Sequence, residues 1–182
     1  MKINLKKMII INTIVMFILS FGVHFGYTLL PNNVIAIFFP VNESIWEHMK
    51  MIYTTVLFSG IIELIIMKKN NIEYNNFLLV TYLKSILIIP IYLILFLPLF
   101  YNIGENMIVA ILTMLISMIV INIIGYYLLQ TNNITNQNII SIFLIIFTYI
   151  IMGLLTFKTP RMELFFDTKE EKYGINDYLI KD

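Results

Sequence analysis

One short polar segment contains the residues of this sequence that are best suited to chemistry. Residues 42–48 read Asn-Glu-Ser-Ile-Trp-Glu-His, and they include two carboxylates, the only tryptophan and one of the two histidines. Strongly apolar sequence flanks the segment on both sides. Ionisable side chains are rare inside membranes and usually have a partner or a function there. The segment therefore predicts either a functional site or a stretch of chain at the water surface.

Metal-assisted hydrolysis is one chemistry that these residue types could support. Imidazole and carboxylate groups bind zinc, and a zinc ion with an open coordination position activates water. Glu43 and His48 are five residues apart, however, so one helix does not direct both at one ion as H-E-x-x-H does. A metal-dependent membrane hydrolase is thus an alternative, and the sequence identifies neither a cofactor nor an enzymatic activity. The weak candidates for metal ligands are His24, His48, Glu43 and Asp167.

The composition predicts an integral membrane protein. Hydrophobic residues make up 59% of the chain, charged residues only 13%, and the mean hydropathy is +0.87. These values exceed what a soluble domain of this length usually carries. A net charge of +1 without a basic block argues against nucleic acid as a partner. The absence of cysteine excludes disulfides and thiolate metal sites.

Five apolar runs are long enough to cross roughly 30 Å of hydrocarbon, which takes about 20 residues. The sequence thus predicts an all-α, polytopic membrane helix bundle over residues 1–157, followed by a polar C-terminal tail at 158–182. Pro90 and Pro98 should kink the third helix or end it early, and we expect the kink at Pro90. The predicted spans are Met8–Leu30, Met49–Met67, Phe77–Leu99, Glu105–Gln130 and Asn138–Phe157.

The lysines in the short connections predict an orientation in the cell membrane, because Lys and Arg are enriched in cytoplasmic loops. Lys68 and Lys69 lie between the second and third spans, whereas the connections on the other side have only Lys50. The N-terminus is also lysine-rich, so we expect it in the cytoplasm and the C-terminus outside. The mixed charges of the tail oppose this orientation. The N-terminal lysines are Lys2, Lys6 and Lys7, and the basic residues of the tail are Lys158, Arg161, Lys169 and Lys172.

With this topology, the polar residues converge on the outer face of the membrane. His24 would lie about six residues before the end of the first helix, within reach of a cavity, and Asp167 and Arg161 would start the tail on the same side. We expect the second helix to begin near Glu43, with Glu43 and Glu47 stacked at i, i+4. Like charges repel at that spacing, which would favour a proton, a cation or Arg161 beside them. The complete candidate cluster is Glu43, Glu47, His48, Arg161, His24, Asp167, Trp46 and Asn42.

A purely structural interpretation of the same segment is equally open. Ser44-Ile45-Trp46-Glu47 matches the capping box, in which the glutamate reaches back to a backbone N–H. Glu43 suits the positive end of a helix dipole, and Trp46 suits the lipid headgroup region as an anchor. This interpretation does not account for His24 and His48.

The segment also resembles a known family. Residues 40–50, Pro-Val-Asn-Glu-Ser-Ile-Trp-Glu-His-Met-Lys, are similar to a PVNESxWEHxK signature of small, uncharacterised bacterial multi-pass membrane proteins. Residues 157–174 are similar to a PPHxPLFxD stretch ending in Tyr-Gly in that family, but Thr159-Pro160-Arg161 stands where the family tends to have Pro-Pro-His. The resemblance implies a shared outer-face site with no assigned activity, and the arginine argues against a metal there.

The function that we expect is a noncatalytic membrane component whose polar outer face binds a protein partner or a lipid headgroup. Besides the hydrolase, the alternative is a small-ion or solute transporter subunit, because ionisable residues also occur in the spans. Glu63 and Lys84 fall at comparable depths in the second and third spans, and we expect them to form a structural ion pair. Other partners consistent with the sequence are the lipid bilayer itself and a second copy of the chain.

Overall fold

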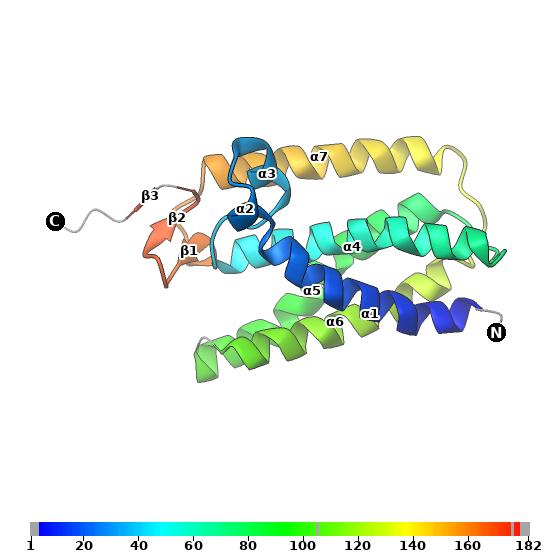
Figure 1. Cartoon of the computed structure of the whole chain (residues 1–182), viewed down its shortest axis with the longest axis horizontal. Coiled ribbons are helices and arrows are strands. Elements are labelled where there is room, and N and C mark those ends of the chain that lie inside the picture. The colour runs from blue at the N-terminus through cyan, green and yellow to red at the C-terminus, as the bar shows by residue number, and fades with distance from the viewer. Residues whose placement is uncertain (1–3, 105, 176, 179–182) are drawn as a thin grey trace.

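Five long apolar helices form the body of the molecule in a computed structural model that describes residues 4–104, 106–175 and 177–178 (Figure 1). Each of the five is long and apolar enough to cross a membrane. The prediction of an all-α, multi-pass membrane bundle is therefore confirmed. Lys2 and Glu105 lie outside the described residues. The long helices are α1 (Leu5–His24), α4 (Ile45–Lys69), α5 (Phe77–Ile103), α6 (Met107–Leu128) and α7 (Gln137–Phe157).

The first span is shorter at its C-terminal end than we predicted. α1 ends at His24 instead of Leu30, and two short helices follow, α2 (Gly26–Leu29) and α3 (Asn33–Phe38). The ring of Phe39 lies directly against Gly26, where a Cβ atom would clash. The chain therefore folds back on itself after His24 instead of continuing the span.

The third span is longer than we predicted. α5 continues as one helix through Pro90 and Pro98 to Ile103, so neither proline ends it. Whether Pro90 kinks the helix remains a prediction.

Four helices enclose the main apolar core. α4 and α6 each pack against both α1 and α5, and Met16, Ile52, Ile88 and Met118 are completely buried between them. The outward faces carry large exposed apolar side chains, as expected of a surface in contact with lipid.

The short helix α3 lies between α4 and α7 at one end of the bundle (Figure 1). Two side chains from α4 hold it there, since Lys50 Nζ donates to the Ala36 carbonyl at 2.8 Å and Thr54 Oγ1 donates to the Phe38 carbonyl at 2.7 Å. These bonds satisfy carbonyl groups that a helix of six residues leaves without partners. α7 itself packs chiefly on α3 and α5.

The C-terminal tail folds onto the end of the bundle that carries α3 (Figure 1). A 3-10 helix, η1 (Glu163–Phe165), packs against α4. The strands β1 (Phe166–Asp167), β2 (Lys172–Tyr173) and β3 (Asp177–Tyr178) then form an antiparallel sheet in the order β1-β2-β3. The described part of the tail thus forms a cap on the bundle.

Candidate functional site

The polar segment at residues 40–48 forms the entrance to α4. Ser44 is the N-cap of this helix, and its Oγ accepts a hydrogen bond from the Glu47 N–H at 3.3 Å. The Asn42 side chain accepts from the Ser44 N–H at 2.9 Å and so turns the chain into the helix. Glu43 therefore precedes the helix, and our expectation that Glu43 and Glu47 stack at i, i+4 on one helical face was wrong.

Glu47 forms a closed ion pair with a lysine that we did not include in the site. Lys50 Nζ lies 2.6 Å from Glu47 Oε2, and its other donors bond the Ala36 carbonyl and Thr156 Oγ1, each at 2.8 Å. An ammonium group has three donors, so all of those on Lys50 are used. The Glu47 carboxylate also accepts from the Val41 N–H and from Thr156 Oγ1, both at 3.1 Å. Glu47 and Lys50 are almost completely buried, so this network joins α3, α4 and α7 structurally.

Two hydrogen bonds attach the tail to the same segment. The Asp167 carboxylate accepts from the Glu43 N–H at 2.9 Å and from the Lys169 and Glu170 N–H groups at 2.8 and 3.1 Å. Asn42 Nδ2 donates to the Gly174 carbonyl at 2.9 Å. Asp167 and Asn42 are buried, so both side chains position the tail beside Glu43.

The Glu43 side chain lies at the centre of a looser, half-exposed cluster. Its Oε1 is 3.5 Å from His24 Nε2, and its Oε2 is 3.8 Å from His48 Nε2 and 3.7 Å from Lys169 Nζ. The imidazole rings are 5.7 Å apart between centroids. About a third of the Glu43 side chain and a quarter of each histidine side chain are exposed. His24, which we expected six residues inside the first helix, is instead its last residue, and this brings it to the mouth of the site.

When its ring is neutral, His48 presents an acceptor nitrogen to an acceptor oxygen of Glu43. His48 Nδ1 lies 3.0 Å from the Ser44 carbonyl oxygen, which can only accept, so this nitrogen carries the proton. In the neutral ring, Nε2 is then an acceptor, and it faces the acceptor Oε2 of Glu43 at 3.8 Å. The contacts of the Glu43 carboxylate with His24, His48 and Lys169 are all longer than a normal hydrogen bond. The gap between the two acceptors is suited to a hydrogen-bond donor.

Trp46 and Arg161 lie around this cluster without joining its centre. The Trp46 ring packs on Phe165 of the tail with ring centroids 5.0 Å apart. The Arg161 guanidinium lies over the ring of Tyr173, 5.6 Å from its centroid. The cation beside Glu47 is Lys50 and a cation beside Glu43 is Lys169. Arg161 was one of three alternatives that we considered there, with a proton and another cation.

The geometry does not favour a metal centre. Among the described residues, no group of three or more His, Cys, Asp or Glu side chains is arranged to hold a metal ion.

The intramembrane residues Glu63 and Lys84 meet in a second buried network. Lys84 Nζ donates to Glu63 Oε2 at 2.9 Å, and Asn12 Nδ2 donates to the same oxygen at 2.9 Å. Asn12 also bonds Asn122, which in turn donates to Thr13 Oγ1 at 3.0 Å. Adding a Cβ at Gly125 would bring it to 2.6 Å from the Lys84 stem, so this glycine makes space for the lysine. We did not predict Asn12 and Asn122, because asparagine is common throughout the chain.

Comparison with known proteins identifies a family but no function. No curated protein matches the chain, and no solved structure matches it either. A family model described as a family of unknown function, DUF6512, matches residues 1–175. The chain that carries the Glu43 cluster and these two buried networks therefore belongs to DUF6512, a family of unknown function.

Proposed function

We propose that this protein is a noncatalytic membrane component that binds a lipid headgroup bearing a primary ammonium at the Glu43 cluster. The phosphoethanolamine headgroup has this chemistry. Its ammonium would lie between Glu43 Oε2 and His48 Nε2, and its phosphate would lie toward Lys169. In keeping with the lysine distribution, we place this end of the bundle on the outer face of the cell membrane.

The observation that carries the proposal is the difference between this cluster and the two buried ion pairs. Lys50 is 2.6 Å from Glu47 and Lys84 is 2.9 Å from Glu63, and both pairs are buried. The contacts of Glu43 are 3.5–3.8 Å long, and its side chain is about one-third exposed. These distances are longer than direct hydrogen bonds, so a group beside the cluster could donate to its acceptors. The buried pairs therefore stabilise the fold, whereas the Glu43 cluster can accept a ligand.

The charge and hydrogen bonding of the cluster select an ammonium group. The carboxylates of Glu43 and Asp167 outnumber the one ammonium of Lys169 when both imidazoles are neutral. A hydrogen-bond donor would satisfy both Glu43 Oε2 and the neutral His48 Nε2, and a primary ammonium has three N–H donors. A trimethylated ammonium has no N–H donor, so the site should discriminate between the two headgroups.

The chain has only two histidines, and both belong to this cluster, so selective isotope labelling of histidine reports on the site directly. We would titrate the labelled, full-length protein in neutral detergent with short-chain phosphatidylethanolamine at fixed pH. We expect the signals of His24 and His48 to shift. They should shift much less with phosphatidylcholine of the same chain length, and Glu43→Gln should abolish the response.

Glu163→Gln is the matched control, because Glu163 is an exposed carboxylate on the same side of the molecule outside the cluster. This variant should respond as the unmodified protein does. Soluble phosphoethanolamine distinguishes a free ligand from a lipid, and a response to it as strong as to the lipid would argue against a lipid as the natural ligand. Equal responses to the ethanolamine and choline lipids, or none to either, would refute the proposal.

A further inference from the structure

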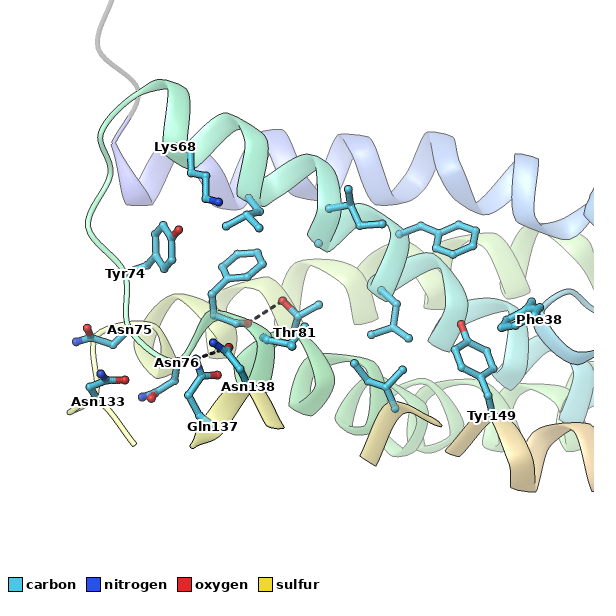
Figure 2. Close-up of a pocket in the computed structure, with 18 residues that line it drawn as sticks. Phe38, Lys68, Tyr74, Asn75, Asn76, Thr81, Asn133, Gln137, Asn138 and Tyr149 are labelled. Atoms are coloured by element: carbon cyan, nitrogen blue, oxygen red, sulfur yellow. Dashed lines mark hydrogen bonds between the residues drawn. The ribbon is translucent and has the colours of Figure 1, made fainter. Parts of the chain in front are cut away.

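A large cavity lies between α4, α5 and α7, away from the Glu43 cluster. Its volume is about 680 Å³, within the range of roughly 300–1,000 Å³ that is usual for ligand sites. α3 fills the space between α4 and α7 at the outer end, and the cavity occupies the remaining length toward the other end (Figure 1, Figure 2). Phe38 of α3 and Tyr149 of α7, with rings 4.7 Å apart, close it on the side of α3.

The lining of the cavity is polar at one end and apolar along its length. Figure 2 shows the labelled polar side chains gathered at the end of α4 near Lys68, with Phe38 and Tyr149 at the far end. Between these ends the lining is largely aliphatic and aromatic, including Leu57, Leu64 and Ile145. The polar end is formed by Lys68, Asn75, Asn76, Asn133, Gln137 and Asn138.

The polarity and the length of the cavity match one leaflet of a bilayer. Lys68 and Leu57 are eleven positions apart on α4, which corresponds to about 16 Å at 1.5 Å per residue. This length is about half of a hydrocarbon core of roughly 30 Å. The polar end lies at the terminus of α4, where the membrane surface is expected.

Lys68 gives the polar end of the cavity a positive charge. Its side chain is exposed, and its ammonium makes no hydrogen bond or ion pair with any residue that the structure describes. No Asp or Glu side chain lines the cavity within the described chain. The nearby amides are partly engaged in joining the connections before α5 and α7, since Asn76 Oδ1 accepts from the Ile134 N–H at 2.7 Å. The site therefore favours an anionic headgroup.

We infer that this cavity binds an anionic membrane phospholipid, with its headgroup at Lys68 and one acyl chain along the cleft between α4 and α7. The occupant is taken from the leaflet opposite the Glu43 cluster. This inference uses different residues from the proposed headgroup site, so either can fail without the other.

The probe for this inference is phosphatidylglycerol with a photoreactive diazirine in the middle of one acyl chain. The full-length protein is reconstituted in bilayers of phosphatidylcholine that contain this probe, and cross-linked residues are identified by mass spectrometry. We expect cross-links to Leu57, Leu64 and Ile145 that unlabelled phosphatidylglycerol competes away more strongly than unlabelled phosphatidylcholine.

Two pairs of neighbouring substitutions separate the cavity from the general lipid surface. Ile145→Trp fills the cavity and should remove the cross-links, whereas Ile146→Trp changes an exposed position that does not line it and should preserve them. Lys68→Gln should reduce the preference for phosphatidylglycerol roughly fivefold, as expected for one lysine near a membrane surface. Lys69→Gln alters an exposed lysine outside the cavity and should leave the preference unchanged.

If Ile145→Trp does not fold, the comparison of Lys68→Gln with Lys69→Gln still tests the inference, because both lysines are exposed. Cross-linking in Ile145→Trp equal to that in the unmodified protein would overturn the inference. Equal competition by the two lipids, or equal effects of Lys68→Gln and Lys69→Gln, would overturn it as well.

Discussion

Lys50 is the residue on which the packing of three helices depends. It is fully buried, and its three donors bond Glu47, Ala36 and Thr156 on α4, α3 and α7. A buried charge is stable only while its partners are present, because desolvation costs several kcal/mol for each ion. The pair therefore fixes where α3 and α7 lie, although it need not make the protein more stable than apolar side chains would.

We predict that Lys50→Met lowers the free energy of unfolding by about 3–5 kcal/mol, because it leaves the Glu47 carboxylate buried and unpaired. Thermal unfolding of the protein in detergent measures this loss. Lys69→Met, at an exposed position on the same helix, is the control and should change the stability by less than about 0.5 kcal/mol.

The double variant Glu47→Gln/Lys50→Met tests the cause of this loss. It should be more stable than Lys50→Met alone, because it no longer contains an unpaired buried charge. A double variant less stable than Lys50→Met would show that the charge of Glu47 is not the source of the destabilisation.

At the scale of elements, one glycine allows the C-terminal tail to approach the end of α7 closely. Gly174 has φ of +56°, and a Cβ added to it would lie 2.7 Å from the Thr156 carbonyl oxygen. Its own carbonyl accepts the hydrogen bond from Asn42. A side chain at this position would therefore both strain the backbone and push β2 away from the end of α7.

We predict that Gly174→Ala detaches the tail from α4 while the helical bundle stays folded, since the alanine costs about 1–2 kcal/mol in backbone conformation before any clash. Trp46 is the only tryptophan and packs on Phe165, so its fluorescence emission should move to longer wavelength. Gly22→Ala is the control, because a Cβ there meets nothing within 4 Å. An unchanged emission spectrum in Gly174→Ala would contradict the role of this glycine.

The sequence predicted the long helices better than the elements that complete the site. Hydropathy identifies α4 to α7 because each apolar run is long, and Ser44 marks the start of α4 to within two residues. The same signal ran through His24 to Leu30, since residues 25–30, Phe-Gly-Tyr-Thr-Leu-Leu, contain no charged residue. The fold-back at Gly26 depends on contact with Phe39, which is a tertiary feature.

The sequence predicted several residues of the candidate site, but it did not predict which of them bond one another. The density of polar residues identified Glu43 and His48, and the predicted topology added His24 and Asp167; the structure brings all four together. The sequence could not pair Lys50 with Glu47. The other two groups that bond Lys50, the Ala36 carbonyl and Thr156 Oγ1, come from distant parts of the chain. Pairing in the membrane is a property of helix packing, which a single sequence does not specify.

At the scale of the whole molecule, the bundle has two chemically different ends. One carries the Glu43 cluster, α3 and the tail, and the other carries the polar mouth of the cavity at Lys68 (Figure 1, Figure 2). An odd number of spans places the two chain termini on opposite sides of a membrane. The two proposed lipid sites then face different leaflets.

We predict that Glu163 is reached from outside the cell and Lys69 from the cytoplasm, because lysine-rich short connections remain inside. The chain has no cysteine, so single cysteines at Glu163 and Lys69 can be labelled in intact cells with an impermeant thiol reagent. Glu163→Cys should be labelled, and Lys69→Cys should be labelled only after the cells are broken open. The reverse pattern would invert our assignment of leaflets while leaving the bundle unchanged.

The tail's contact with the start of α4 also has a consequence for biosynthesis. Asp167 and Gly174 bond to residues 124 and 132 positions earlier in the chain, so the Glu43 cluster is completed only after the last span has left the ribosome and entered the membrane. A premature stop codon shortly after α7 would preserve all five spans and still yield a protein whose site lacks Asp167 and Lys169. Quality control that monitors only membrane insertion would not recognise such a product as defective.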